Sequence, residues 1–276
     1  MDKSVDVIEG MEKQGSMKKL CILVLLCICT LAAFGAEQKH SYAYNYLASY
    51  PGSGLEAIKS PLIWQGKEWL TAGAIVVGAS ALYMIDEDLR DFAQSNDSET
   101  SKAISLVAKQ FGEGKLIIPI IGASILGGYI LDSPKTMDTG LLSLKSFILS
   151  QTVTQSLKLG TQRNRPSTGK GKEFWNGRGI KRKRDSFPSG HSTIAWSLAP
   201  IFAEQYGSHS WVAPVVYTIA GLTSLSRVHD NNHWSSDVFV GAVIGYYSAK
   251  LTLKSTPRLQ IAPDPIQQNI GIYWNF

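Results

Sequence analysis

Residues 186–205, SFPSGHSTIAWSLAPIFAEQ, combine the two patterns that recur along this chain. A polar turn, Pro188-Ser189-Gly190-His191, comes directly before a run of apolar and small residues at 192–205. Proline and glycine mark turns and element boundaries, and an apolar run of this length exceeds an ordinary strand. We therefore predict a helix that begins near Ser192.

Five further stretches share this composition, and each is roughly 14 to 17 residues long. They are residues 69–85, 116–131, 141–157, 211–226 and 237–252. Their apolar residues are not confined to one stripe, which predicts helices buried on most faces.

A shorter helix is expected between the first two stretches. Ile104, Val107, Ala108 and Phe111 recur at helical spacing, and Asn96-Asp97-Ser98 marks a turn and a helix start. Strand signals are few. The sequence therefore predicts an all-α fold, a six-helix bundle with an extra short amphipathic helix.

The composition supports a folded, helix-rich protein. The chain is 44% hydrophobic and 18% charged, which excludes a disordered chain and lies below the roughly 25% charge of soluble domains. Each apolar stretch is slightly shorter than the ~20 residues that span a bilayer. A water-soluble bundle and a membrane bundle both remain open.

The N-terminal segment has the pattern of a secretory signal peptide. Residues 17–36, MKKLCILVLLCICTLAAFGA, join a Met and two lysines to an apolar run and then to small residues. We predict cleavage at Gly35 or Ala36 and a true translation start at Met17. An uncleaved anchor and a lipid-modified Cys27 are the alternatives.

This segment sets the predicted boundaries: signal peptide 1–36, an irregular or partly helical lead 37–65, the main domain 66–255, and an extended tail 256–276. Within the tail, residues 269–276 alternate enough for a lone strand or an extended peptide. All three cysteines lie in the signal peptide, so the mature chain is expected to form no disulfide and no cysteine metal site.

The positive charge of the mature chain is local. Residues 158–184 hold ten basic residues and one acid, Glu173. A phosphate site, anionic lipid headgroups and a solvated loop are the competing interpretations. Only Phe174 and Trp175 interleave with these charges, so we expect no nucleic-acid partner.

Three motifs carry chemistry. The first is Lys158, six residues, then Arg165-Pro166; the second is Pro188-Ser189-Gly190-His191; the third is Ser226-Arg227, five residues, His233, three residues, Asp237. Together they resemble the tripartite signature of the type 2 phosphatidic acid phosphatase (PAP2) family, which includes vanadium haloperoxidases and acid phosphatases. All eleven signature positions are present, and the resemblance covers about residues 65–252. It implies a helical bundle and a phosphatase activity.

The residue types fit phosphoryl transfer, which requires positive charge on the nonbridging oxygens. Lys158, Arg165 and Arg227 can supply that charge, and an arginine fork meets two oxygens at once. Ser189 and Gly190 precede a helix, where backbone N–H groups favour an anion. We expect these five residues to bind phosphate.

Three residues are predicted to be catalytic. We expect His233 to be the nucleophile that forms a phosphohistidine. Asp237 would orient its ring from one helical turn away. His191 would be the general acid for the leaving oxygen and later the base for water. The family's corresponding residues have the same roles.

Other residues receive weaker assignments. His229 is expected to support the site from outside it or to be exposed. Arg163 and Asn164 are candidates for phosphate contact, with solvation as the default. Lys181 to Arg184 form either a steering patch or a plain basic loop. No closed ligand set is present in the mature sequence, so we predict no metal and no cofactor.

These observations predict a metal-independent phosphatase of the bacterial cell envelope, periplasmic and either soluble or associated with the inner membrane. The apolar helices favour membrane contact and lipid phosphates: isoprenyl diphosphate, phosphatidic acid, phosphatidylglycerol phosphate or lipid A. The alternative is a soluble periplasmic acid phosphatase of broad specificity, or a phosphotransferase. Halide oxidation is disfavoured because such relatives are much longer. No oligomeric state is predicted.

Overall fold

The computed structural model describes residues 46, 49–55, 59–177, 185–255, 258–263 and 270–275. The chain divides into two units, Met1–Tyr50 and Pro51–Phe276. Of the first unit, residues 46, 49 and 50 are described, and they are helical. The predicted signal peptide, residues 1–36, lies outside the described residues. The elements of the fold belong to the second unit.

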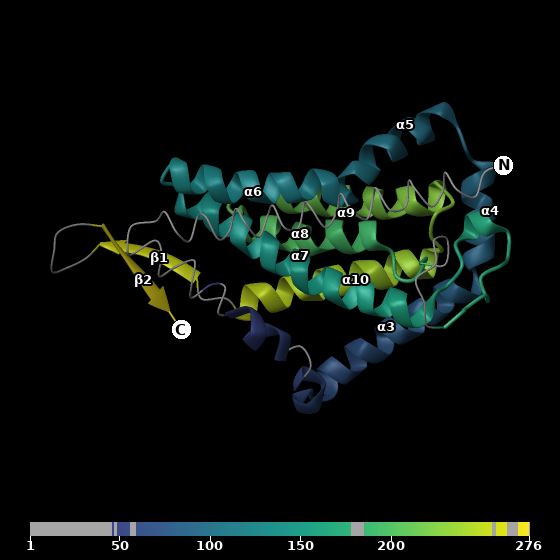
Figure 1. The fold of residues 1–276 in the computed structure, drawn as a ribbon, viewed down its shortest axis with the longest axis horizontal. Helices are drawn as coiled ribbons and strands as arrows, with labels where there is room; N and C mark the ends of the chain where they lie inside the picture. Colours follow the sequence, from purple (N-terminus) through teal and green to yellow (C-terminus); the bar gives the residue numbers. More distant parts are fainter. Residues whose placement is uncertain are drawn as a thin grey trace, which may run out of the picture. The chain divides into compact units, whose positions relative to one another are not determined.

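Four long helices form the centre of this unit (Figure 1). They are α7 (Pro134–Thr161), α8 (Gly190–Gln205), α9 (Val212–His229) and α10 (Ser235–Ser255). Helix α8 packs against the other three, and α6 (Gly114–Ile130) packs against α7. The predicted all-α class is confirmed, and the apolar stretches all lie in helices.

Small and hydroxylated residues allow α8 and α10 to approach closely. A Cβ atom added at Gly241 of α10 would lie 2.5 Å from the carbonyl oxygen of Ser189. One turn further along α8, the hydroxyl of Ser192 donates to the carbonyl of Val238, at 2.8 Å. Backbone contact of this kind needs residues without bulky side chains. It fixes the start of α8, where the second motif lies, against α10.

The segment between α3 (Gly66–Met84) and α6 contains two short helices rather than one. Helix α5 (Glu99–Ala108) begins as predicted, because the hydroxyl of Ser98 accepts from the backbone N–H of Ser101 in a capping box. It continues into the 3₁₀ helix η2 (Lys109–Gly112). Helix α4 (Asp86–Ser95) was not predicted. Three acids in its first turn favour a helix start, and none of them belongs to an apolar stripe.

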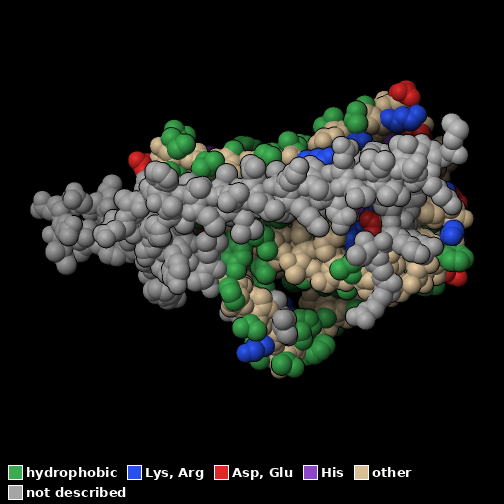
Figure 2. All heavy atoms as spheres, in the orientation of Figure 1, with side chains coloured by type: hydrophobic (Ala, Val, Ile, Leu, Met, Phe, Trp, Pro, Cys, Tyr) green, Lys and Arg blue, Asp and Glu red, His purple; other side chains and the backbone are tan. Residues whose placement is uncertain are grey.

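Helix α3 (Gly66–Met84) departs from the prediction that each apolar stretch is buried on most faces. None of its residues is buried, and Leu70 is 76% exposed. Its apolar side chains are visible at the lower edge of the molecule, where α3 lies (Figure 2). The expectation was wrong here because composition alone does not show how many neighbours a helix has.

None of the described helices is by itself both long and apolar enough to cross a bilayer. Two bent pairs reach that length and composition only in combination. They are α3 with α4, bent by 57°, and the segment Glu99–Gly112 with α6, bent by 51°.

The predicted extended tail forms a two-stranded antiparallel ribbon. Strand β1 (Arg258–Pro263) pairs with β2 (Ile270–Asn275), with Ile261 opposite Ile272. The sequence predicted at most a lone strand. The ribbon arises because an extended backbone needs a partner for its N–H and C=O groups.

Candidate active site

The three motifs meet at one end of the four central helices. Lys158 lies in the last turn of α7, Ser189 caps α8, and Arg227 lies in the last turn of α9. His233 stands just before α10 and is buried. Four positively charged or titratable side chains act electrostatically on it: Arg165, Lys158, His191 and Arg227. The structure therefore brings the predicted site residues together.

The ring of His233 is held by a backbone carbonyl. Its Nδ1 lies 2.7 Å from the carbonyl oxygen of Ser186. Because a carbonyl oxygen only accepts, Nδ1 carries the hydrogen and Nε2 keeps its lone pair. Burial lowers the pKa of His233 well below its ordinary value, and the neighbouring cations, Arg165 first, lower it further. The ring is therefore neutral at neutral pH, as a nitrogen nucleophile must be.

Asp237 does not contact His233 in the way predicted. Its carboxylate accepts from the guanidinium of Arg163 at 2.5 Å, from the hydroxyl of Ser186 at 2.5 Å and from the N–H of Trp234 at 3.0 Å. The helical spacing failed as a guide because α10 begins at Ser235, after His233. Asp237 acts on the histidine indirectly, since Ser186 bonds to both residues.

Arg163 and Asn164 are buried, so the expectation that they are solvated was wrong. Arg163 bridges Asp237 and Asp86, which lies at the start of α4 and is also fully buried. Asp86 in turn accepts from the backbone N–H and the hydroxyl of Ser236, at 2.8 and 2.5 Å. Sequence reasoning missed Asp86, because a single acid in DEDLRD carries no signal of burial.

Aromatic rings surround the Arg163 guanidinium. Its central carbon lies 4.9 Å from the ring centroids of Tyr83 and Trp175 and 5.5 Å from that of Trp234. The indole of Trp234 also donates to the carbonyl of Asn164, at 2.9 Å. Cation–π contacts in a desolvated setting add to the ion pairs. Residues 163–164 thus belong to the interior that supports the site.

The two predicted phosphate-binding groups of the first motif share one carboxylate residue, Asp185. Arg165 donates to both oxygens of Asp185, at 3.0 and 3.1 Å, and to the side-chain oxygen of Asn232 at 3.2 Å. The ammonium of Lys158 donates to the backbone carbonyl of Asp185. Burial lowers the pKa of Lys158 to about 8. Lys158 therefore remains mostly cationic at neutral pH but loses its charge in the mildly alkaline range.

The remaining cation, Arg227, is buried and pairs with Asp230. Its Nε atom, like the hydroxyl of Ser189, is buried and has no hydrogen-bond partner among the described residues. Buried polar groups are rarely left unpaired, and each exception needs an explanation. Ser189 also stands at the N-terminus of α8, without a side-chain capping bond. An oxyanion beside this helix end would satisfy the hydroxyl of Ser189.

His191 lies in the first turn of α8 and is partly exposed. Its Nε2 is 3.2 Å from a carboxylate oxygen of Glu113, a residue between η2 and α6 that the sequence did not single out. His233 is buried whereas the side chain of His191 is 28% exposed. The exposed ring is placed as a proton-transfer group would be.

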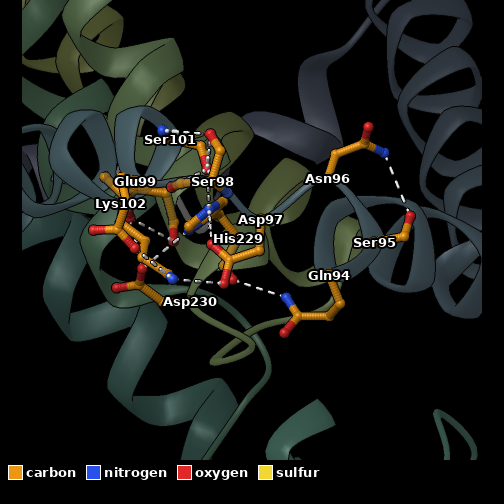
Figure 3. A network of polar contacts seen from close by, with 12 residues as sticks. Gln94, Ser95, Asn96, Asp97, Ser98, Glu99, Ser101, Lys102, His229 and Asp230 are labelled. Atoms are coloured by element: carbon orange, nitrogen blue, oxygen red, sulfur yellow. Dashed lines mark hydrogen bonds and ion pairs between the residues drawn. The ribbon is translucent and has the colours of Figure 1, made fainter.

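His229 belongs to a separate polar network at the start of α5 (Figure 3). Its Nε2 lies 3.0 Å from the hydroxyl of Ser101 and 3.2 Å from Asp97, and its Nδ1 lies 3.5 Å from Asp230. Gln94 donates to its backbone carbonyl, at 2.8 Å. The structure thus uses His229 to join α5 to the end of α9, beside the carboxylate that pairs with Arg227.

The basic segment is only partly described. Lys181 to Arg184 lie outside the described residues. Lys172 is not free, because its ammonium donates to the carbonyl of Met84 at 2.6 Å. Within the described residues, no group of three or more His, Cys, Asp or Glu side chains is arranged to hold a metal ion. Metal independence remains a prediction.

Comparison with known proteins finds partial similarity to one family. A family model described as the PAP2 superfamily matches residues 139–261. A lipid A 1-phosphatase of Porphyromonas gingivalis is 43% identical over 68 residues, which are 24% of this chain and 15% of that protein. An acid phosphatase of Zymomonas mobilis is 39% identical over 62 residues, which are 22% of each chain. The matched segments thus span a small part of these relatives.

Two solved structures have folds similar to that of this chain. One is LpxE of Aquifex aeolicus, 23% identical, with a TM-score of 0.48 over 60% of this chain and 93% of that one. The other is a transmembrane PAP2-type phosphatidylglycerolphosphate phosphatase of Bacillus subtilis. It is 21% identical, with a TM-score of 0.49 over 66% of this chain and 93% of that one.

Proposed function

We propose that the protein is a phosphatase of the PAP2 superfamily, whose family model matches residues 139–261, and that it works through a phosphohistidine at His233. The observation that carries the proposal is the state of His233. The side chain is buried and neutral, its Nδ1 is bonded to the carbonyl of Ser186, and cations surround it. This arrangement leaves Nε2 as an oriented nucleophile beside an anion site.

The first half of the reaction transfers the phosphoryl group. Lys158, Arg165 and Arg227 bind the nonbridging oxygens, together with the hydroxyl of Ser189 and the N-terminus of α8. Nε2 of His233 forms a bond to phosphorus while the bond from phosphorus to the leaving oxygen breaks. His191 gives its proton to that oxygen, so the product leaves as a neutral alcohol.

The second half returns the enzyme to its starting state. The neutral His191 takes a proton from a water molecule, whose oxygen attacks the phosphohistidine. The P–N bond breaks, and inorganic phosphate leaves. Ser186 holds the ring of His233 throughout, and Asp237 and Arg163 hold Ser186. Positioning of this kind is a large part of catalysis for phosphoryl transfer.

Lipid phosphates are the proposed substrates, and contact with a membrane in the cell envelope is part of the proposal. Large apolar side chains are exposed on several helices, among them Leu70 and Val77 of α3, Val107 of α5 and Ile130 of α6. Exposed apolar surface of this extent is typical of interaction surfaces. The Porphyromonas relative is named for activity on lipid A. The alternative is a periplasmic enzyme for small esters, or a phosphotransferase, and the Zymomonas relative is named an acid phosphatase.

The test is phosphate release in a mild detergent with a chelator present. A polyprenyl diphosphate, phosphatidic acid, phosphatidylglycerol phosphate and lipid A are compared with p-nitrophenyl phosphate. Preference for one of the lipids supports the proposal, whereas better turnover of the soluble ester favours the alternative. Loss of activity with chelator that returns with a divalent metal would contradict metal independence.

His233→Ala is the matched variant for the chemical step. We expect it to release no phosphate from any of these substrates, because no other group forms the intermediate. Quenched wild-type protein should carry an acid-labile, alkali-stable phosphoryl label, which is typical of phosphohistidine, and the variant should carry none. Activity or label at the wild-type level in the variant would refute the nucleophile.

A further inference from the structure

Glu113 is a carboxylate that no signature motif contains, yet it contacts a residue of the second motif. Its Oε2 lies 3.2 Å from Nε2 of His191. The two side chains are 42% and 28% exposed, so the pair lies at the edge of the site rather than in the core. A contact at this exposure contributes little to stability. Its location next to the proton-transfer histidine suggests another role.

The backbone fixes Glu113 in this place. A Cβ atom on the preceding residue, Gly112, would lie 2.6 Å from the carbonyl oxygen of His191 and 2.7 Å from its Cβ. The backbone of η2 therefore touches the first turn of α8. On its other side, η2 packs against α9. Directly before η2, the carbonyl of Ala108, the last residue of α5, accepts from the hydroxyl of Thr223 at 2.8 Å. The packing of η2 between α8 and α9 thus places Glu113 next to His191.

The charge around the pair keeps Glu113 ionised. The hydrogen bond with His191 is the main cause of a lowered pKa for Glu113, and Lys115 and Arg227 act in the same direction. His233 also faces His191 electrostatically, and it is neutral. An ionised carboxylate only accepts hydrogen bonds. Nε2 of His191 is therefore the donor, and Nδ1 is the ring nitrogen left for the substrate.

We propose that Glu113 is a positioning residue that fixes the tautomer of His191, so that His191 exchanges protons with the leaving group and with water through Nδ1. The inference rests on the proposed phosphatase function. In the first half-reaction the imidazolium gives its Nδ1 proton to the leaving oxygen and keeps the Nε2 hydrogen bonded to Glu113. In the second half, the Nδ1 lone pair takes a proton from water. No further reactant is needed.

The experiment compares Glu113→Gln with a matched control, Glu99→Gln, whose side chain is 94% exposed on α5. The measured quantity is kcat/KM for two soluble esters. Phenyl phosphate has a poor leaving group that needs a proton, and p-nitrophenyl phosphate has a better one that needs it less. We expect Glu113→Gln to lose about tenfold or more with phenyl phosphate and about threefold or less with the nitrophenyl ester. Glu99→Gln should match the wild type with both.

A double variant distinguishes a positioning role of Glu113 from a general effect of its replacement on the structure. If Glu113 acts through His191, adding Glu113→Gln to His191→Ala causes no further loss, because coupled residues are not additive. Glu113→Asp, which keeps the carboxylate, should recover part of the phenyl phosphate activity. Equal losses on both esters, or additive losses in the double variant, would overturn the inference.

The outcomes for the two proposals differ. If the wild type hydrolyses neither soluble ester nor any lipid phosphate, the phosphatase function fails and the role of Glu113 fails with it. If the wild type is active, His233→Ala is inactive and Glu113→Gln behaves as Glu99→Gln does, only the role of Glu113 fails. If Glu113→Gln unfolds, the test uses Glu113→Asp instead. A folded Glu113→Asp variant that loses no more activity with phenyl phosphate than with p-nitrophenyl phosphate contradicts the inference.

Discussion

Replacement of Arg163 by Met is the sharpest test of the interior beneath the site. The guanidinium is fully buried and pairs with two carboxylates, those of Asp86 and Asp237, which are also fully buried. Met fills a similar volume but leaves both carboxylates without their cation. Removal of one partner from a buried ion pair costs about 3–5 kcal/mol. At roughly 2–4 °C per kcal/mol for a domain of this size, Tm should fall by about 6 °C or more.

The loss should also depend on pH, and the sign follows from Asp237. Burial raises the pKa of Asp237, and the charge of Arg163 is the main influence that opposes the rise. Without Arg163, the folded protein holds a proton on this carboxyl at a higher pH than the unfolded chain does. Stability then falls as pH rises. The Tm deficit of Arg163→Met should therefore be larger at about pH 8 than at about pH 5.5.

The assay is thermal unfolding in detergent at both pH values, with Lys102→Met as the control. Lys102 is half-exposed and forms two surface ion pairs, with Asp97 at 3.3 Å and Glu99 at 3.2 Å. Surface ion pairs of this kind contribute little to stability, so the control should melt within a few degrees of the wild type. If the two variants melt alike, or if the deficit of Arg163→Met does not change with pH, the cluster does not hold the fold as argued.

Two further predictions concern the site. Burial lowers the pKa of Lys158 to about 8. The inhibition constant for inorganic phosphate should therefore rise as pH increases through that value. Lys158→Arg should show a flatter pH profile of this constant, because arginine keeps its charge. A pH-independent constant in the wild type would contradict a phosphate contact by Lys158. Gly112→Ala places a Cβ atom 2.6 Å from the carbonyl of His191, whereas one at Gly114 has only Ile118, at 3.9 Å, nearby. Gly112→Ala should lower the free energy of unfolding by about 1–3 kcal/mol, seen as a lower Tm, and should reduce phenyl phosphate turnover. Gly114→Ala should change neither quantity. If the two variants behave alike, η2 can move away from α8.

The long helices could be predicted from short-range apolar pattern, whereas the meeting of the three motifs was expected because together they resemble one family signature. Asp86 and Glu113 could not be found in this way. Each is a single acid in a polar stretch, and only the packing of α4 and of η2 against the bundle decides that one is buried and the other contacts His191. The role of Asp237 was misassigned for a related reason. Helical spacing relates two residues only inside one helix, and His233 lies outside α10.

Each arginine of the proposed phosphate site has a carboxylate partner, and this pairing bears on how a phosphate would bind. A guanidinium has five N–H groups. Arg165 uses two of them on Asp185 and one on Asn232, so two remain. Arg227 pairs with Asp230 through Nη2, while its Nε has no partner among the described residues.

The carboxylates therefore order the arginines without using all of their donors. Three clustered cations would otherwise repel one another, and long side chains would lose conformational freedom when a substrate arrives. With Asp185 and Asp230 in place, the donors that remain are already oriented when the phosphoryl group enters. The same carboxylates offset part of the positive charge, which would limit how tightly product phosphate is held in the proposed reaction. Preorganisation and product release thus follow from the same ion pairs.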